Sequence, residues 1–393
     1  MYYQSTDEKF CLYKGDTLQI LGQIPNQFDM IFADPPYFLS NGGKKIQGRR
    51  MVSVDKGEWD KIKSSDGIDK FNQEWINQCK PLLKDNGTIW VCGTYHNIFS
   101  VEKCLKNAGF RIINIITWQK SDPTPTWGKL HFNFSSEYII WAKKTSMAKH
   151  YFNYELMKQL NGGKLMSDVW KIPTVGLWEK TCGKHPTQKP LRLLYRIILA
   201  STKVGETILD PFAGSSTTGI AANLLGRNYI GIEQNEEFLH LGEKRKMDIE
   251  NPLRFVDMQK HMADNPNEIT VIVNHARRET KERMVETGIC YLRAGDSEGS
   301  LCVTHGFERM EYVLLHTSGE NCQIFKLKRK GCFQIWNKET LERYGFSPSH
   351  AAYYIVLKFD NKEIKGFKIP NNIKERINTY RAKIRPLSDF FDF

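Results

Sequence analysis

Short apolar runs alternate with helical patterns along the first part of the chain. Residues 28–33 and 88–92 are apolar runs typical of buried strands, and residues 69–83 between them carry apolar side chains at helical spacing. The sequence Lys-Asp-Asn-Gly at 84–87 supplies a stop signal for this helix. Farther along, the pattern predicts two more elements, a helix at 101–108 and a strand at 112–118. Because strands and helices alternate, we expect a parallel sheet with crossover helices.

The same rhythm returns near residue 190. The pattern there predicts an amphipathic helix, a strand, a helix and a strand, in that order, at residues 191–201, 207–209, 216–225 and 228–232. A strand is also expected at residues 136–142, whereas residues 145–184 show little periodicity. We therefore expect one α/β domain over residues 1–255.

Beyond about residue 255, apolar runs alternate with turns, and the helical spacing fades. Five runs predict strands, at residues 269–273, 312–316, 322–328, 332–336 and 353–359. A chain of 393 residues is long enough for two domains. We therefore expect a smaller, β-rich α+β appendage over residues 260–393.

The composition is that of an ordinary water-soluble globular protein, with 40% hydrophobic and 25% charged residues. No apolar run reaches the roughly 18 residues that would suggest a membrane span, and the first residues lack a signal-peptide pattern. The nine cysteines are dispersed without a C-x-x-C pair, which argues against a metal site or a disulfide framework. We expect a cytoplasmic protein with neither a metal nor a membrane partner.

Positive charge is in excess along this chain. The net charge is +12 and the isoelectric point is near 9.1. Such a surplus is compatible with a polyanionic partner, although it indicates non-specific attraction only.

The sequence Asp34-Pro35-Pro36-Tyr37 directly follows the apolar run at 28–33, at the strand end where open α/β sheets bind ligands. A nucleobase amine is a poor nucleophile, because its lone pair is delocalised into the ring. Hydrogen bonds from the amine to the Asp34 carboxylate and the Pro35 carbonyl would localise that lone pair, and the prolines stiffen the turn. Tyr37 is suited to stacking on a base that has left the duplex. The simpler alternative is a strand-ending turn with Tyr37 in the core.

Residues 210–219, with the sequence D-P-F-A-G-S-S-T-T-G, lead from a predicted strand into a predicted helix. Gly214 permits a positive φ and a close approach of the backbone to a ligand. Ser215, Ser216 and Thr217 are suited to capping the helix, and the N–H groups of its first turn suit a carboxylate. The segment therefore predicts a site for an anionic group.

Two acids accompany this turn at strand ends. Asp210 is placed to bind an ammonium group, and Glu233 ends the next strand, where an acid commonly accepts hydrogen bonds from ribose hydroxyls. Carboxylate, ammonium and ribose together match S-adenosylmethionine. No Lys follows Gly219 and no G-x-G-x-x-G occurs, so a Walker-type phosphate loop is excluded and a nicotinamide site is disfavoured.

Together these motifs resemble those of the DNA adenine-N6 methyltransferases of restriction–modification type, in the β arrangement where D-P-P-Y precedes the donor motif. The likeness covers roughly residues 10–250 and includes five stretches, Lys14-Gly15-Asp16, residues 33–37, the sequence H-P-T-Q-K-P at 185–190, residues 210–219, and Gly231-Ile232-Glu233. The resemblance implies an α/β, Rossmann-like fold that depends on S-adenosylmethionine, with a seven-stranded mixed sheet in which one strand is antiparallel.

The resemblance also assigns roles to single residues. Asp16 matches the acid that contacts the adenine ring of the donor, and D-P-P-Y favours an adenine target, since cytosine-N4 enzymes usually carry Ser at the position of Asp34. The catalytic residues that it implies are Asp34, Pro35, Pro36 and Tyr37. The donor-binding residues that it implies are Asp16, Asp34, Thr187, Gln188, Lys189, Asp210, Phe212, Ala213, Gly214, Ser215, Ser216, Thr217 and Glu233.

Double-stranded DNA is the partner that the resemblance implies, and three basic regions are candidates to contact it. They are the long connection at 38–70, with Lys44, Lys45, Arg49 and Arg50; the insert at 143–184, with Lys143 and Lys144; and the C-terminal run with Lys326, Lys328 and Lys330. In each region a solvated basic loop is the alternative, and the C-terminal run equally suits another partner.

Three readings of the function remain open. The first is the adenine-N6 DNA methyltransferase, with cytosine-N4 as the alternative base. The second is a methyltransferase of the same fold that acts on RNA or protein, and the third is a catalytically idle DNA-binding module, which the intact motifs disfavour. A cognate restriction endonuclease and a second copy of the chain are further partners to consider.

Overall fold

The computed structural model forms two compact units. The N-terminal unit comprises Met1–Phe152, Ser167–Ala222 and Arg227–Glu243, and the C-terminal unit comprises Asn153–Met166, Asn223–Gly226 and Lys244–Phe393. The structure describes residues 1–24, 27–38, 44–47, 50–53, 65–120, 123, 130–161, 164–172, 174–175, 177–180, 182–250, 270–294, 310–317, 322–328, 333–349, 351, 353–364 and 383–386. No helix within these ranges is both long enough and apolar enough to cross a bilayer.

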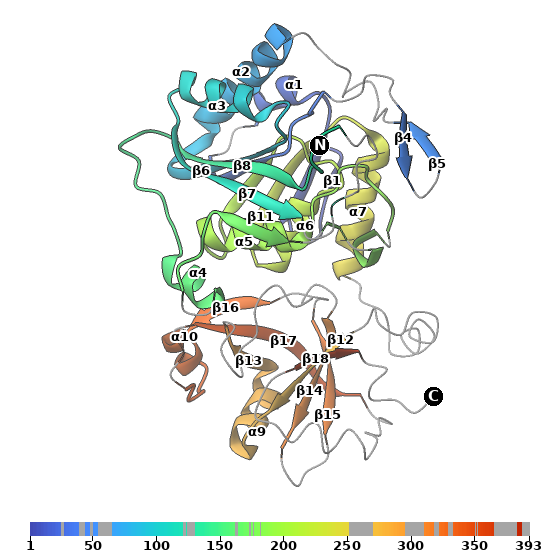
Figure 1. Cartoon of the computed structure of the whole chain (residues 1–393). Coiled ribbons are helices and arrows are strands. Elements are labelled where there is room, and N and C mark those ends of the chain that lie inside the picture. The colour runs from blue at the N-terminus through green and yellow to red at the C-terminus, as the bar shows by residue number, and fades with distance from the viewer. Residues whose placement is uncertain are drawn as a thin grey trace. The chain divides into compact units, whose positions relative to one another are not determined.

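One mixed sheet organises the N-terminal unit (Figure 1). Among the described residues its strands follow the order β1 (Tyr3–Gln4), β2 (Phe10–Lys14), β11 (Asn228–Glu233), β10 (Thr207–Asp210), β3 (Phe28–Ala33), β6 (Leu83–Gly93), β8 (Ser136–Lys143), β7 (Arg111–Lys120) and β9 (Val169–Ile172). The run from β2 to β7 contains the seven expected strands, and β8 is its antiparallel member. The predicted fold class is therefore confirmed, and the short strands β1 and β9 extend the two edges.

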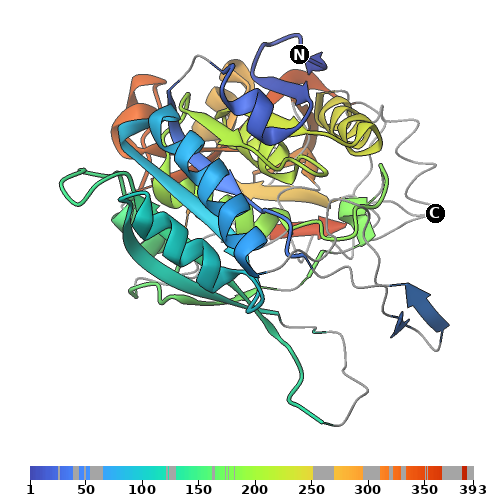
Figure 2. The same cartoon turned by 90° about the horizontal axis from the view of Figure 1, so that it is seen from above.

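Helices cover both faces of this sheet. On one face lie α1 (Thr17–Leu21), α2 (Ser65–Leu82) and α3 (Ile98–Asn107), whose apolar side chains share a core with Ile31 of β3 and Val91 of β6. Figure 2 shows α2 and α3 side by side above the strands. On the other face lie α5 (Leu191–Ser201), α6 (Thr217–Leu224) and α7 (Glu236–Glu250).

The apolar sequence of the central strands explains why they are buried. Every residue of β3, Phe-Asp-Met-Ile-Phe-Ala, is buried, as expected for a parallel strand covered by helices on both sides. Its alternate side chains reach opposite faces, since Ile31 belongs to the core under α2 while Met30 contacts Ser201 of α5. Trp90 of β6 donates a hydrogen bond to the same Ser201 at 3.0 Å, which ties α5 to the sheet.

A separate sheet forms the C-terminal unit. Within the described part it has the order β13 (Ile289–Arg293), β17 (Tyr353–Glu363), β15 (Gln323–Leu327), β14 (Met310–His316), β12 (Thr270–His275) and β18 (Lys383–Pro386), and β16 (Gln334–Asn337) also pairs with β17. The helices described in this unit include α4 (Tyr154–Leu160), α9 (Arg278–Thr287) and α10 (Lys338–Arg343). All five strands predicted beyond residue 255 are present.

Some local features go beyond the predictions. The helix α2 ends at Leu82, as the stop signal at 84–87 predicts, but β6 begins directly at Leu83 and pairs irregularly with β3 across these residues. The region 145–184, which lacks periodicity, contains α4, β9 and the short 3₁₀ helix Leu177–Lys180. Within the long connection at 38–70, β4 (Lys44–Gln47) and β5 (Arg50–Ser53) pair as a hairpin.

Candidate active site

The two motifs found in the sequence meet at the same edge of the sheet, the one formed by the carboxyl ends of its parallel strands. Strands β3 and β10 are parallel neighbours, with Met30 beside Ile208 and Ile31 beside Leu209. Asp34 directly follows β3 and Asp210 ends β10, so both acids lie at the carboxyl ends of the strands. Both line a cavity of about 280 Å³, and the expected meeting of the two loops is confirmed.

Most of the predicted donor-site residues line this cavity. They are Asp16, Asp34, Thr187, Gln188, Lys189, Asp210, Phe212, Ala213, Gly214, Ser215, Thr217 and Glu233. Pro36 of the D-P-P-Y motif also lines the cavity. Pro35, Tyr37 and Ser216 are buried and are not among the lining residues. A volume of this size is near the lower end of the range for small-molecule sites, roughly 300–1,000 Å³.

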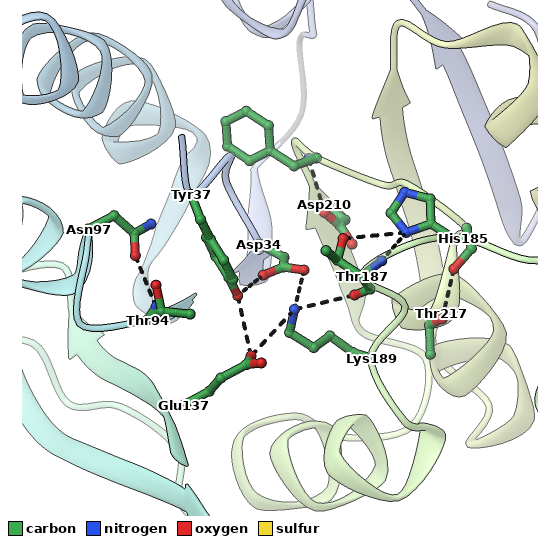
Figure 3. A network of polar contacts seen from close by, with 12 residues as sticks. Asp34, Tyr37, Thr94, Asn97, Glu137, His185, Thr187, Lys189, Asp210 and Thr217 are labelled. Carbon is green, nitrogen blue, oxygen red and sulfur yellow. Dashed lines mark hydrogen bonds and ion pairs between the residues drawn. The ribbon is translucent and has the colours of Figure 1, made fainter. Parts of the chain in front are cut away.

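The Asp34 carboxylate is held by two short hydrogen bonds (Figure 3). The hydroxyl of Tyr37 donates to Oδ1 at 2.6 Å, and the ammonium of Lys189 donates to Oδ2 at 2.6 Å. Lys189 also lies 5.2 Å from the centre of the Tyr37 ring and 3.7 Å from Oε2 of Glu137. Lys120 closes the cluster with an ion pair of 2.7 Å to Oε1 of Glu137.

The charges of this cluster determine the protonation states of Lys189 and Tyr37. Burial alone would lower the pKa of Lys189, but the carboxylates of Asp34 and Glu137 outweigh that effect and raise the pKa above its ordinary value. Burial, reinforced by the same two carboxylates, raises the pKa of Tyr37 well above the usual range. At neutral pH, Lys189 is therefore an ammonium and Tyr37 a phenol, and both donate to Asp34.

The stacking role expected for Tyr37 stays a prediction. In this structure Tyr37 is only 6% exposed, its ring lies beside Lys189, and it is not among the residues that line the cavity. The next residue, Phe38, lines the cavity instead and packs edge-to-face against Phe71 at 5.6 Å. Phe38 has a φ of 54°, a left-handed conformation that is uncommon for a bulky residue and concentrates at functional sites.

Asp210 is a buried carboxyl group with local donors. Its Oδ1 accepts a hydrogen bond from the backbone N–H of Phe212 at 3.0 Å. Burial raises the pKa of Asp210 to about 7, the donors Thr218 and Phe212 partly oppose this rise, and the nearby acids Asp34 and Glu233 add to it. A cationic ligand would stabilise the ionised form, which suits the ammonium group expected here.

Glu233 holds the glycine turn. Its Oε2 accepts from the backbone N–H of Gly214 at 2.8 Å, and its Oε1 accepts from Asn235 at 2.8 Å. Burial raises the pKa of Glu233, and these backbone donors oppose the rise. An ionised carboxylate has about four lone-pair sites, and the backbone of Gln234 is a third donor, so at least one site remains for a hydroxyl group of a ligand in the cavity.

The turn before α6 departs from the predicted capping. Gly214 has a φ of +50° and packs so closely on His185 that a Cβ would lie 3.1 Å from the ring. Ser216 also has a positive φ, of 57°, which turns its hydroxyl toward Gly242 of α7. Its Oγ has no hydrogen-bond partner in the described part of the chain, so the cap expected from Ser216 is not formed.

Two further polar groups face the cavity from outside the glycine turn. Asp16 caps α1 by accepting from the N–H groups of Leu18 and Gln19 at 3.0 and 3.4 Å. The side chain of Gln188 donates to the backbone oxygen of Glu179 at 3.0 Å, while its own Oε1 is buried without a partner among the described residues.

Two of the residues predicted to contact DNA, Lys143 and Lys144, lie away from the cavity. Lys143 is the last residue of the antiparallel strand β8, at the edge of the sheet opposite the cavity, and its Nζ donates to the oxygen of Ala148 at 2.9 Å. Lys144 follows it and donates to the backbone oxygen of Leu83 at 2.6 Å. Contact of these two residues with DNA stays a prediction.

The remaining basic candidates lie elsewhere. Lys44, Lys45 and Arg50 belong to the β4–β5 hairpin, whose backbone alone is described, and Arg49 lies outside the described residues. Lys326 and Lys328 lie in and directly after β15, whose pairing with β17 shifts register at this point. Lys330 also lies outside the described residues.

Exposed aromatic side chains gather at the same edge of the sheet as the cavity. Tyr95 follows the end of β6, and Phe132 and Phe134 precede the start of β8, at exposed fractions of 46%, 95% and 54%. The rings of Tyr95 and Phe134 stack with their centres 5.0 Å apart and their planes at 10°. We call these three residues the aromatic patch.

The sequence interpretation missed several residues of the site. Glu137, His185 and Phe38 contribute to the cluster or the cavity, yet none was assigned a role from the pattern alone. A signal for Glu137 existed, because it is an acid that enters an otherwise apolar strand, Ser-Glu-Tyr-Ile-Ile-Trp-Ala. Within the described residues, no group of His, Cys, Asp and Glu is arranged to hold a metal ion.

Comparison with known proteins places this site in context. Residues 28–244 match a family model described as DNA methylase. The chain is 55% identical over 260 residues to the type II methyltransferase M2.MboI of Moraxella bovis, covering 66% of this chain and 95% of that protein. It is 52% identical over 246 residues to the type II methyltransferase M2.DpnII of Streptococcus pneumoniae, covering 62% of this chain and 91% of that protein.

A solved structure is similar in fold. The PvuII DNA methyltransferase, described as cytosine-N4-specific, matches with a TM-score of 0.51 and 19% sequence identity. The match covers 66% of this chain and 92% of that one. At this level of identity the likeness concerns the fold alone. The family match ends at residue 244, so most of the C-terminal unit lies beyond it.

Proposed function

This chain belongs to the DNA methylase family, and from that premise we propose that it transfers a methyl group from S-adenosylmethionine to the N6 amine of a flipped-out adenine in DNA. The observation that carries the proposal is the shared cavity of the Asp34 and Asp210 loops. One loop suits an amine that must be made nucleophilic, and the other suits an amino acid bound to a nucleoside.

The residues of the glycine turn fit the donor. Asp210 would pair with the ammonium of its methionine part, and Glu233 and the Gln188 Oε1 would accept from its hydroxyl or amino groups. Asp16 caps the first turn of α1 and lines the cavity, where an acid would meet the adenine part of the donor. When bound, S-adenosylmethionine supplies an electrophilic methyl group on a sulfonium.

The D-P-P-Y loop supplies the other half of the site. Asp34 and the backbone carbonyl of Pro35 would accept the two hydrogens of the target amine and localise its lone pair. Because Lys189 and Tyr37 hold the carboxylate in place, the acceptor is oriented before the base arrives. The residues act by positioning, and no covalent bond between the base and the enzyme is required.

An aspartate at position 34 favours adenine over cytosine-N4 as the target. Its two oxygens offer strong acceptors for the amine. Cytosine-N4 transfer stays the alternative, as does transfer to RNA or protein.

The partner that we propose is double-stranded DNA. The aromatic patch lies at the edge of the sheet that carries the cavity, where its exposed rings could stack on bases. The relatives' names describe type II methyltransferases, so we propose a cognate restriction endonuclease as a genetic partner. A homodimer is a further proposal that light scattering of the purified protein would test.

Transfer of a tritiated methyl group tests the proposal directly. The purified protein is incubated with labelled donor and, separately, unmethylated plasmid DNA, single-stranded DNA, RNA and a protein mixture. Label in the plasmid DNA is expected, and label in RNA or protein but not DNA would refute the proposal. Methylation-aware sequencing of the plasmid would then identify the base and the recognition sequence.

A further inference from the structure

We propose that Glu137 is a positioning residue, which takes over the Lys189 ammonium when the target amine binds Asp34. The inference rests on the proposed function and deepens it. Glu137 is the second residue of β8, and its side chain is 13% exposed. It does not line the cavity, so it acts on the reaction through its neighbours.

The hydrogen bonds that Asp34 already accepts explain why such a residue is needed. Both of its oxygens already accept short hydrogen bonds, from Tyr37 at Oδ1 and from Lys189 at Oδ2, each at 2.6 Å. A carboxylate whose charge is neutralised by a contacting ammonium is a weaker acceptor for a neutral amine. To bind the target strongly, Asp34 has to give up part of its contact with Lys189.

Glu137 is the second acceptor for both donors. Its Oε2 lies 3.7 Å from Nζ of Lys189 and 3.5 Å from the hydroxyl of Tyr37 (Figure 3). A shift of about 1 Å by either donor would exchange a hydrogen bond to Asp34 for one to Glu137, since such bonds span about 2.7–3.2 Å. Lys189 is 6% exposed, so water is a poor substitute for this second carboxylate.

Lys120 keeps Glu137 ready for this exchange. Its Nζ binds Oε1 of Glu137 at 2.7 Å, which leaves Oε2 as the oxygen directed toward Lys189 and Tyr37. The cluster then contains two carboxylates and two ammonium groups. Moving Lys189 from Asp34 to Glu137 leaves the net charge of the cluster unchanged, and the ammonium keeps a carboxylate partner throughout.

A double-mutant cycle tests the inference. Single-turnover methyl transfer to unmethylated plasmid DNA is measured for the wild type, Glu137→Gln, Lys189→Met and the double variant. Glu137→Gln is expected to slow transfer about tenfold, while the Kd values for donor and DNA change less than about twofold, because the exchange concerns a single contact to the target amine. In the Lys189→Met background the same change is expected to have little further effect, because Glu137 acts through Lys189.

Two more variants separate this role from a structural one. Glu102→Gln removes a carboxylate that pairs with Lys106 on α3, and it is expected to leave the rate unchanged. Glu137→Asp keeps the charge and is expected to retain at least about half of the rate. Equal losses in the Asp and Gln variants, or additive losses in the cycle, would overturn the inference.

The outcome also distinguishes this inference from the proposed function. A wild-type protein that labels no DNA would remove the proposed function and this inference together. A wild type that labels DNA, with Glu137→Gln equally fast, would remove the role of Glu137 alone. Thermal unfolding of each variant, compared with the wild type, identifies any loss that comes from misfolding.

Discussion

At the scale of single residues, the site joins two kinds of buried acid. Asp34 is paired with Lys189 and Tyr37, so its charge is compensated within the protein. Asp210 has no such cation among its described contacts, and burial raises its pKa to about 7. We propose that the first acid loosens its contact with Lys189 to accept from a neutral amine, while the second gains its partner only when a cation binds.

Replacement of Asp34 should separate chemistry from donor binding. Asp34→Asn keeps the shape of the side chain but weakens the acceptor, and Asp34→Ala removes it. Methyl transfer is expected to fall at least about 100-fold in both, the scale of losing one preorganised polar group in a transition state. Isothermal titration should find the donor Kd within about threefold of the wild type. A loss of donor affinity as large as that of Asp210→Asn would contradict this division of roles.

The raised pKa of Asp210 predicts a pH dependence of donor binding. Below about pH 7 the free carboxyl is protonated, and it must lose that proton to pair with an ammonium group. Donor affinity should therefore weaken as the pH falls from 8 to 6, approaching about tenfold per unit at the acid end. Titrations in buffers of different ionisation enthalpy would measure the released proton. Asp210→Asn should bind weakly with a flatter pH profile, and an unchanged slope would assign the proton to Glu233.

At the scale of elements, strands and helices with a clear period were predicted well. The strand at 28–33 and the helix at 191–201 have the observed bounds, because each is buried along its length by neighbours on both sides. Local sequence says less where long-range pairing decides. The stop signal at 84–87 correctly predicts the end of the helix, but these residues belong to β6, which pairs with β3, and β9 pairs with β7 in a region of little periodicity.

The site residues were also predicted unevenly. The loops after β3 and β10 were found because their residue types, in that order, are typical of binding an amine and a carboxylate-bearing donor. Glu137 and His185 were missed as functional residues, since their roles depend on contacts with Lys189 and Gly214 that are distant in sequence. Lys143 and Lys144 were assigned to DNA by charge, and the antiparallel direction of β8 carries them to the opposite edge.

Close packing of α6 on the sheet depends on one glycine. A Cβ at Gly219 would lie 2.4 Å from the ring of Tyr229 and 2.5 Å from that of Phe10. Gly219→Ala should therefore lower the free energy of unfolding by about 1–3 kcal/mol through overpacking. Gly22→Ala is the control, because its Cβ would meet nothing within 4 Å. Urea midpoints at constant slope measure both, and equal stability of the two variants would contradict the packing argument.

The aromatic patch should contribute to DNA binding. Tyr95→Ala and Phe132→Ala each remove an exposed ring at the edge of the sheet that carries the cavity, and stacking on a base is worth about 1–3 kcal/mol. The DNA Kd measured by fluorescence anisotropy is expected to rise at least about fivefold, with the donor Kd unchanged. Met147→Ala serves as the control, since Met147 is 87% exposed beyond β8 at the opposite edge. A similar weakening by Met147→Ala would remove the assignment.

At the scale of the whole molecule, the chain combines a unit that matches its relatives with one that lies mostly beyond the match. The family model ends at residue 244, and the C-terminal unit has its own sheet and its own buried core. Asn153–Met166 and Asn223–Gly226 also belong to this unit, so the chain enters it before its C-terminal part begins. We propose that the unit adds a DNA-binding surface.

The charge of this unit allows the last test. Lys326, Lys328 and Lys330 lie in or near β15, and replacing all three by Gln removes three positive charges. If they bind phosphates, the slope of log affinity against log salt should become shallower by about 0.9 for each phosphate that is no longer neutralised. The control replaces Lys84, Lys143 and Lys144, which removes the same charge at the sheet edge opposite the cavity. Equal slopes in the two triple variants would mean that overall charge alone attracts DNA, and that the C-terminal unit binds another partner.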